Sequence, residues 1–149
     1  MTRSIKATLA TLLFAFIFVL SAQADKDTPI SVNQLPHTAQ SILKKSFSGV
    51  KVALAKKESD LIGKSYEVIF TNGDKIEFDG NGKWTDISCK KTSVPASLLP
   101  GAITNYVIQN YGRVRIVEID RDRRGYSVQL SNGIELDFDK SFRLMNIDN

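Results

Sequence analysis

Apolar residues recur every three to four positions in two segments of the chain that start 64 residues apart. The first segment opens at Leu35-Pro36 and the second at Leu99-Pro100. Such spacing places apolar side chains on one stripe of an amphipathic helix. Proline suits the first turn of a helix, because its missing N–H removes no hydrogen bond there. The pattern predicts two helices of about three turns each, with these residues facing the core: Ala39, Ile42, Leu43, Phe47, Ile103, Tyr106, Val107 and Tyr111.

Alternating apolar and polar residues flank two Asn-Gly pairs, at 72–73 and 132–133, which is typical of β-hairpins. A two-residue loop would mix the two faces of each hairpin. A three-residue loop that ends in a left-handed Gly73 or Gly133 keeps the apolar residues on one face. The predicted cross-strand pairs are Val68 with Ile76, Tyr66 with Phe78, Val128 with Leu136 and Tyr126 with Phe138.

Shorter patterns complete two similar units. Alternation begins at 50–52 and again at 114–116, and turns at 79–82 and 140–141 lead into the last strand of each unit. Residues 25–34 are polar and expected to be loose at first, before Ser31 and Gln34 form a capping box.

The fold class predicted from these patterns is α+β. Tandem duplicated helix-plus-four-stranded units, 25–94 and 95–149, form one compact domain, with one continuous antiparallel sheet and the helices on one face.

The first 24 residues have the composition of a signal peptide. Arg3 and Lys6 precede an apolar stretch over 7–20, and Ala22-Gln23-Ala24 supplies small residues for cleavage. The stretch is shorter than the roughly 20 residues of a membrane-spanning helix. The expected product is periplasmic or secreted and has no membrane anchor after cleavage.

Net charge and cysteine content bear on the expected partners and on disulfide formation. Removing Arg3 and Lys6 lowers the formal net charge from +4 to +2, and the lysine pairs are dispersed, so nucleic acid is not an expected partner. Cys89 is the single cysteine, which excludes a disulfide within the chain and predicts partial burial at a strand end. We expect a monomer.

Candidate catalytic groups are few. His37 is the only histidine, at the exposed start of a helix, and no Gly-x-Ser-x-Gly motif is present. The segment 79–82 resembles the start of a calcium loop, but Lys83 and Trp84 stand where a ligand and the glycine belong. The sequence therefore predicts no catalytic residue, no metal site of this type and no cofactor, and the chain is not expected to be an enzyme.

The order of these motifs carries a family resemblance. Leu-Pro, an amphipathic helix, Tyr-x-Val, Asn-Gly and Phe-Asp occur in this order twice, over about 30–149. The chain resembles the PepSY-like family of exported bacterial proteins, whose fold is similar to that of the β-lactamase inhibitory protein. The resemblance implies a non-enzymatic exported protein with a curved sheet, helices on one side and an open concave face. It does not imply β-lactamase inhibition, because the inhibitor proteins use disulfides that this chain lacks.

The favoured function is a binding module that engages or inhibits an unknown protein of the cell envelope through the open face of its sheet. Four apolar residues among charges would form the centre of the interface. The predicted binding residues are Glu67, Ile69, Lys75, Glu77, Ile87, Gln129, Glu135, Asp137, Met145 and Ile147. The alternative is a small-ligand or cation binding protein, in which carboxylates of the same face converge: Glu77, Asp79, Asp137 and Asp139.

Overall fold

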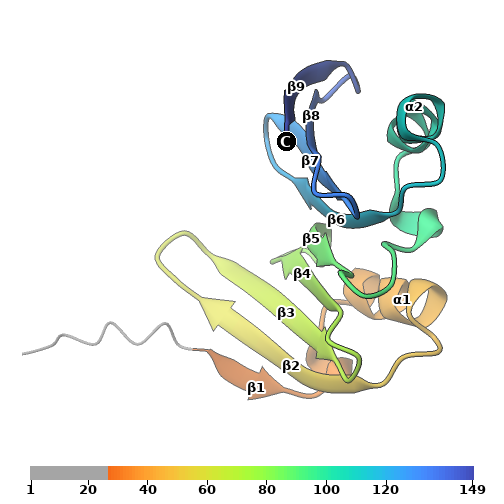
Figure 1. Ribbon diagram of the computed structural model, residues 1–149. Helices are drawn as coiled ribbons and strands as arrows, with labels where there is room; N and C mark the ends of the chain where they lie inside the picture. Colours follow the sequence, from red (N-terminus) through yellow and green to blue (C-terminus); the bar gives the residue numbers. More distant parts are fainter. Residues whose placement is uncertain (1–26) are drawn as a thin grey trace, which may run out of the picture.

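The computed structural model describes residues 27–149; the predicted signal peptide lies outside this range. Nine antiparallel strands form one open sheet, in which each strand pairs with the next one along the chain. Helix α1 spans His37–Ser46 and α2 spans Gly101–Tyr111. The strands are β1 (Thr28–Ile30), β2 (Val52–Ser59), β3 (Lys64–Phe70), β4 (Lys75–Asp79), β5 (Trp84–Ser88), β6 (Ile116–Arg121), β7 (Gly125–Leu130), β8 (Glu135–Asp139) and β9 (Leu144–Asp148) (Figure 1).

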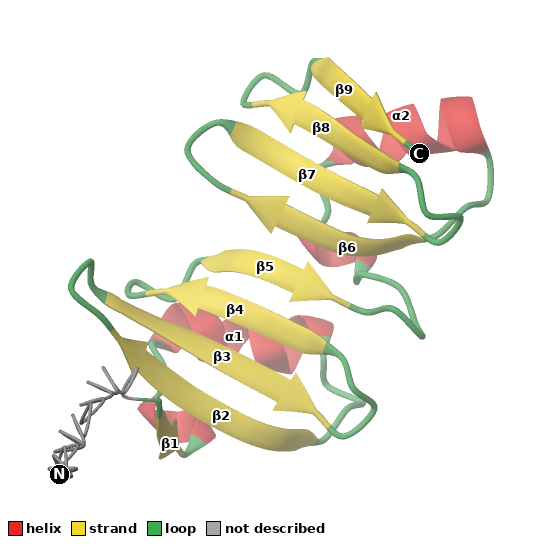
Figure 2. Cartoon of the chain, turned by 60° about the vertical axis from the view of Figure 1, so that its left-hand side comes forward, coloured by secondary structure: helices red, strands yellow, loops and turns green. Residues whose placement is uncertain are grey.

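Both helices cover the same face of the sheet, α1 behind the first strands and α2 behind the last ones (Figure 2). The predicted stripes face the core, since Ala39, Leu43, Ile103 and Val107 are buried. Phe47 stacks on Phe70 with ring centroids 4.6 Å apart. The α+β class, the continuous antiparallel sheet and the one-sided helices are thus confirmed. Neither helix of residues 27–149 is long and apolar enough to span a membrane.

Both Asn-Gly hairpins have the predicted three-residue register. Val68 pairs with Ile76, and Val128 pairs with Leu136. Gly73 and Gly133 have φ angles of 89° and 93°, a region that a residue with a β-carbon adopts at a cost. The apolar side chains of the hairpins therefore lie under the helices, and the alternate residues lie on the open face.

The start of the domain differs from the prediction of a loose segment. Thr28–Ile30 forms the edge strand β1 and pairs with β2. The capping box does form, because the N–H of Ser31 donates to Oε1 of Gln34 at 2.8 Å, but it opens a 3₁₀ turn at Val32–Gln34 rather than α1. Strands β2 and β6 begin two residues later than the alternation indicated.

Two residues predicted on the open face lie on the helix side instead. Ile87 is fully buried and pairs with Ile76, and Ile147 pairs with the buried Leu136. The cause is a β-bulge in each last strand, between Trp84 and Asp86 and between Leu144 and Asn146. A bulge adds one residue and reverses the faces of every residue after it. The predictions for Ile87 and Ile147 are wrong for this reason.

A short strand pair joins the two halves of the sheet. Between β5 and β6 the register holds three pairs: Asp86 with Asp120, Ile87 with Ile119, and Ser88 with Glu118. Arg121 adds to this joint, because its Nε and Nη2 donate to the carbonyl oxygen of Trp84 at 3.0 and 2.6 Å. Its guanidinium carbon also lies 4.1 Å from the centre of the Trp84 ring.

Candidate binding site on the open face

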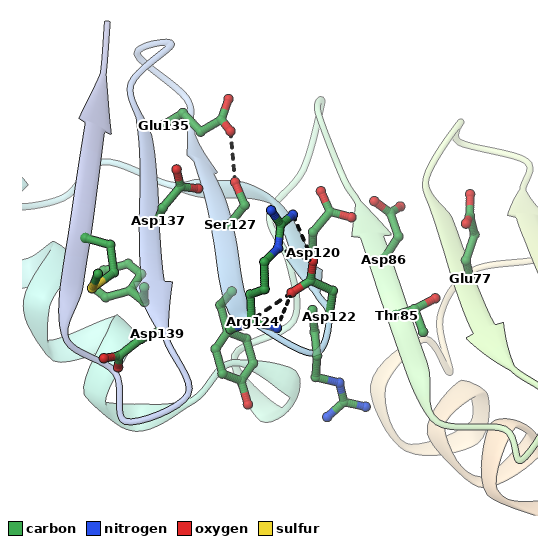
Figure 3. Close-up of a pocket in the computed structure, with 15 residues that line it drawn as sticks. Glu77, Thr85, Asp86, Asp120, Asp122, Arg124, Ser127, Glu135, Asp137 and Asp139 are labelled. Atoms are coloured by element: carbon green, nitrogen blue, oxygen red, sulfur yellow. Dashed lines mark hydrogen bonds and ion pairs between the residues drawn. The ribbon is translucent and has the colours of Figure 1, made fainter.

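A hollow of about 820 Å³ runs across the open face from β4 to β9 (Figure 3). The bulges on β5 and β9 place Thr85 and Met145 at its walls. Its lining is dominated by carboxylates, and the cationic residues that line it within 27–149 are Arg121 and Arg124. The carboxylates come from five segments: Glu77, Asp86, Asp120, Asp122, Glu135, Asp137 and Asp139.

The acids of the first half are partly neutralised, because Lys56 and Lys75 pair with four carboxylates, one of them that of Glu58 at 3.0 Å from Lys56. Glu67 and Glu77 lie directly opposite each other on β3 and β4. Nζ of Lys75 lies 2.9 Å from Oε1 of Glu77 and 3.6 Å from Oε2 of Glu67. Lys56 binds the other side of Glu67, as well as Asp27, at 3.2 and 2.7 Å. The hydrogen bond to Glu77 raises the pKa of Lys75, so this network holds its positive charge on the open face.

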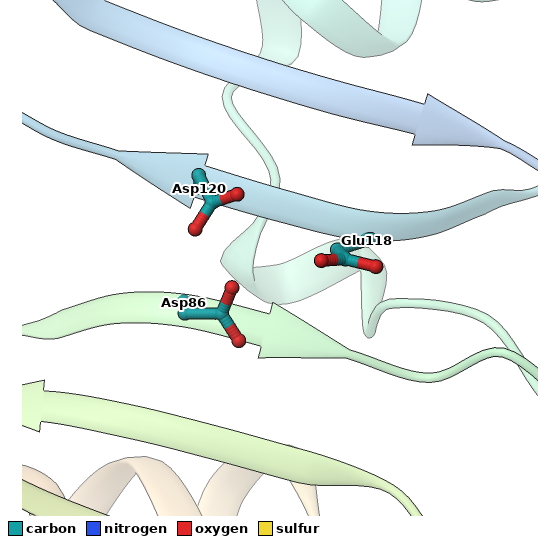
Figure 4. A group of neighbouring side chains, drawn as sticks. All are labelled: Asp86, Glu118 and Asp120. Atoms are coloured by element: carbon teal, nitrogen blue, oxygen red, sulfur yellow. The ribbon is translucent and has the colours of Figure 1, made fainter. Parts of the chain in front are cut away.

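The carboxylates at the joint are less well compensated. Asp86, Glu118 and Asp120 each offer an oxygen, and these oxygens lie within 4.8 Å of one another (Figure 4). Glu118 is paired with Lys90 at 2.8 Å. Oδ1 of Asp86 is buried and has no hydrogen-bond partner among the described residues. Burial, followed by the hydrogen bond and charge of Asp120, raises the pKa of Asp86 to about 8.

In the second half of the face, two carboxylates accept hydrogen bonds from neutral side chains. Oγ of Ser127 donates to Oε1 of Glu135 at 2.9 Å. Gln129 accepts a hydrogen bond from Nζ of Lys90 at 3.0 Å. Asn146 lies on the open face beside Asp137, with its Nδ2 3.5 Å from Oδ2 of that residue. The bonds from Ser127 and Asn146 orient the carboxylates of Glu135 and Asp137 but leave their negative charge in place.

Eight of the ten predicted binding residues share the open face. Of these, Glu77, Glu135, Asp137 and Met145 line the hollow. Ile69 pairs with Lys75 and lies near Glu67 in the first half, and Gln129 pairs with Glu135. Because Ile87 and Ile147 are on the other side, the predicted apolar centre does not form, and the face is charged instead.

The convergence predicted for the cation alternative also differs. Asp79 and Asp139 close turns: Oδ1 of each accepts backbone N–H groups, from Lys83 and Arg143 among others. The backbone hydrogen bond from Arg143 lowers the pKa of Asp139. The carboxylates that do converge are those of the joint, and these were not predicted.

A signal for the missed residues was present in the sequence. Trp84 and Ile87 are three positions apart, as are Leu144 and Ile147, whereas uninterrupted alternation separates residues of one face by two or four. Odd spacing between apolar residues indicates a bulge. Reading it would have placed Asp86 on the open face beside Glu77, with which it pairs.

Nucleophilic chemistry has no support at this face. His37 is exposed at the start of α1, behind the sheet, and does not line the hollow. Cys89 is fully buried, deeper than the predicted partial burial, and this burial raises the pKa of its thiol to about 12. The arrangement can bind and neutralise positive charge, and its described residues hold no activated nucleophile.

A family model confirms the resemblance that the motifs indicated. The model of the family described as "Putative beta-lactamase-inhibitor-like, PepSY-like" matches residues 64–146, which is more than half of the chain. A search among curated proteins finds no match.

Solved structures from two Bacteroides species have the same fold over most of the chain. A "putative periplasmic protein from DUF2874 family" of Bacteroides vulgatus is 52% identical, with a TM-score of 0.82, and covers 85% of this chain and 99% of its own. A "putative calcium-regulated periplasmic protein" of Bacteroides thetaiotaomicron is 54% identical, with the same TM-score and coverage. A second Bacteroides vulgatus protein, described as a "putative periplasmic protein of unknown function", is 39% identical with a TM-score of 0.77 and covers 83% of this chain and 99% of its own. The predicted periplasmic or secreted location is confirmed.

Proposed function

The chain belongs to the PepSY-like, β-lactamase-inhibitor-like family, and from that premise we propose that it is a non-enzymatic periplasmic binding module. Its acidic hollow receives a cationic segment of a protein partner. The observation that carries the proposal is the lining of the hollow, in which seven carboxylates stand against two arginines. In the first half two lysines, Lys56 and Lys75, face four carboxylates of the network, those of Asp27, Glu58, Glu67 and Glu77. The hollow holds a larger excess of acids over cations.

The geometry favours a peptide segment over a flat contact. The hollow extends from β4 to β9, and its walls carry acids from five different segments. A lysine or arginine side chain that enters it meets several oxygens at once, which makes charge-assisted hydrogen bonds. When such a cation binds, Asp86 would release its proton to the solvent, because a neighbouring positive charge favours the ionised carboxylate.

A basic peptide tests this proposal directly. A fluorescent Lys/Arg decapeptide is titrated with the protein and followed by anisotropy at low salt, beside an equal peptide of Glu. We expect binding of the basic peptide only, and about tenfold weaker binding by Asp120→Asn combined with Glu135→Gln. Asp148→Asn, an exposed carboxylate outside the hollow, is the matched control. Equal affinity for both peptides, or no effect of the double variant, would contradict the proposal.

A second candidate function is calcium binding at the joint. Two observations favour it: the three converging carboxylates with the unpartnered oxygen of Asp86, and the printed name of the 54% identical relative. Calcium takes six to eight oxygen ligands and accepts bidentate carboxylates. An ion here would neutralise the facing pair of Asp86 and Asp120 and so stabilise the strand pair that joins the two halves.

Thermal unfolding with and without calcium tests the calcium site at the joint. A ligand that binds only the folded state at a hundred times its Kd stabilises by about 2.7 kcal/mol, so the melting temperature should rise. Asp86→Asn should abolish the rise and Glu135→Gln should not. An unchanged melting temperature in millimolar calcium excludes this candidate and leaves the peptide proposal standing.

We infer further that the two helix-plus-four-strand units derive from one duplicated unit. The ordered recurrence of Leu-Pro, Asn-Gly and Phe-Asp supports this origin. So does the recurrence of bulges at corresponding places, in β2 and β6 and in β5 and β9.

A further inference from the structure

Four turns lie together at one end of the sheet, because every strand runs antiparallel to the one before it (Figure 2). They join β2 to β3, β4 to β5, β6 to β7 and β8 to β9, and we call them the turn end. The first of these turns carries Leu61 and Ile62, whose relative exposures are 103% and 97%. Two adjacent aliphatic side chains are thus held fully in water at the tip of a hairpin.

The fold does not require apolar residues at this tip. In the first turn, Oδ1 of Asp60 accepts the N–H groups of Ile62 and Gly63, at 2.8 and 2.9 Å. In the turn between β6 and β7, Oδ1 of Asp122 accepts those of Arg124 and Gly125, at 2.7 and 3.2 Å. The two turns close with the same hydrogen bonds, yet the second carries two arginines where the first carries leucine and isoleucine.

A second matched pair of turns repeats the contrast. The turns 79–83 and 139–143 both close with an aspartate that accepts two backbone N–H groups. The first holds Gly82 at a φ of 80°, whereas the second holds Phe142 at a φ of 61°, which is unfavourable for an aromatic residue. Phe142 stacks on Tyr126 and is still 37% exposed. Another apolar side chain is therefore kept at the turn end.

The other exposed side chains of the turn end are mostly basic. Lys83, Arg123 and Lys140 are exposed and form no ion pair with any residue in 27–149. Arg124 and Arg143 are 92% and 79% exposed beside their aspartates. The aspartates accept backbone N–H groups of the turns. Two of them, Asp60 and Asp122, are exposed, against five exposed basic residues in the four turns.

We propose that the turn end docks on an anionic lipid surface, with Leu61 and Ile62 entering the interface and the basic residues of the neighbouring turns contacting the headgroups. An apolar pocket of a protein could hold Leu61 and Ile62, but the basic residues are spread over three further turns, and a broad negative surface contacts them all. Apolar insertion and basic residues together give the reversible attachment of peripheral proteins. The sheet would stand on its end. Arg124 belongs both to the turn end and to the lining of the hollow, whereas Leu61, Ile62, Lys83, Arg123 and Lys140 do not line the hollow.

Vesicle binding tests it. The purified mature protein is mixed with vesicles of phosphatidylglycerol and phosphatidylcholine, or of phosphatidylcholine alone, and the bound fraction is measured by sedimentation in about 0.1 M salt, where charge attraction is only partly screened. We expect binding to the anionic vesicles alone. Leu61→Ser with Ile62→Ser should weaken it at least about tenfold. Arg123→Ser with Lys140→Ser, two exposed residues outside the hollow, should weaken it and reduce its dependence on salt.

Matched controls distinguish binding through the turn end from loss of folding and from nonspecific adsorption to vesicles. Ile108→Ser replaces an exposed apolar residue of α2, and Arg113→Ser replaces an exposed arginine that follows α2; both should bind like the wild type, and all variants should keep its circular dichroism and melting temperature. Three outcomes would overturn the proposal: no binding to anionic vesicles, equal binding by the Leu61/Ile62 variant, or a dimer in light scattering that this variant abolishes.

Discussion

At the scale of single residues, Gly63 and Gly125 occupy matching turns, but a side chain is excluded at the two positions for different physical reasons. Gly63 and Gly125 both have a φ of 155°. A β-carbon on Gly63 would have no atom within 4 Å, whereas one on Gly125 would overlap the carbonyl oxygen of Phe138 and the backbone of Asp139. At Gly125 the close approach of β8 forbids a side chain, and at Gly63 only the backbone conformation opposes one.

Alanine substitution should separate these two effects. We expect Gly63→Ala to cost about 1 kcal/mol of the free energy of unfolding, from conformational strain alone. Gly125→Ala should cost about 3 kcal/mol or more, because β7 and β8 must move apart. Urea denaturation followed by tryptophan fluorescence measures both. Similar losses at the two positions would mean that β8 moves aside at little cost.

Cys89 should be inert in the folded protein. Its side chain is fully buried and its pKa is raised to about 12, first by burial and then by the charge of Asp74, so almost no thiolate exists at neutral pH. We expect dithionitrobenzoate to label it only as fast as the protein unfolds, with full labelling in urea. Rapid labelling of the native protein would show that the joint opens locally.

At the scale of elements, the helices and hairpins could be predicted because their signals are local. The stripe of Leu43 and Phe47 and the pair of Asn72 and Gly73 each specify a conformation within a few residues. The bulges could not be predicted by simple alternation, which continued from Trp84 into the wrong face for Ile87. The acidic joint was missed for the same reason, and it also depends on two strands meeting from different halves of the chain.

The joint between the halves should depend on Arg121. Its guanidinium donates two hydrogen bonds to the carbonyl of Trp84 and covers the indole ring. Charge-assisted hydrogen bonds to a buried group and a cation–π contact together predict a loss of about 2–3 kcal/mol for Arg121→Ala.

Arg121→Lys provides the control, because it keeps the charge but loses the paired donors. Its loss should lie between those of the wild type and Arg121→Ala, in chemical denaturation and in hydrogen exchange of β5 and β6. A variant with alanine that is as stable as the wild type would show that the three residue pairs hold the joint unaided.

At the scale of the whole molecule, the facing carboxylates make stability depend on pH. The pKa of Asp86 rises from 3.8 to about 8 on folding, so the folded protein holds a proton that the unfolded chain releases. Stability from this group is fully present below about pH 4 and falls as the pH rises towards 8. Because the side chain is partly exposed, we expect a loss of about 1–3 kcal/mol over this range after solvent screening.

Asp86→Asn should flatten this part of the pH profile, because the amide neither titrates nor repels Asp120. The measurement is urea denaturation at about pH 5 and about pH 8, with Glu135→Gln as a control that should retain the wild-type slope. A wild-type stability that rises between these two pH values, unchanged in Asp86→Asn, would contradict the assignment.

The order of the strands also has a consequence for how the protein folds after export. Because strand order in space equals strand order in sequence, each strand pairs with the strand that precedes it in the chain, with α1 between β1 and β2 and α2 between β5 and β6. A chain that enters the periplasm from its N-terminus always finds the pairing edge for each new strand already in place, so at any moment only one edge strand awaits its partner. Vectorial secretion therefore exposes little unpaired sheet to aggregation.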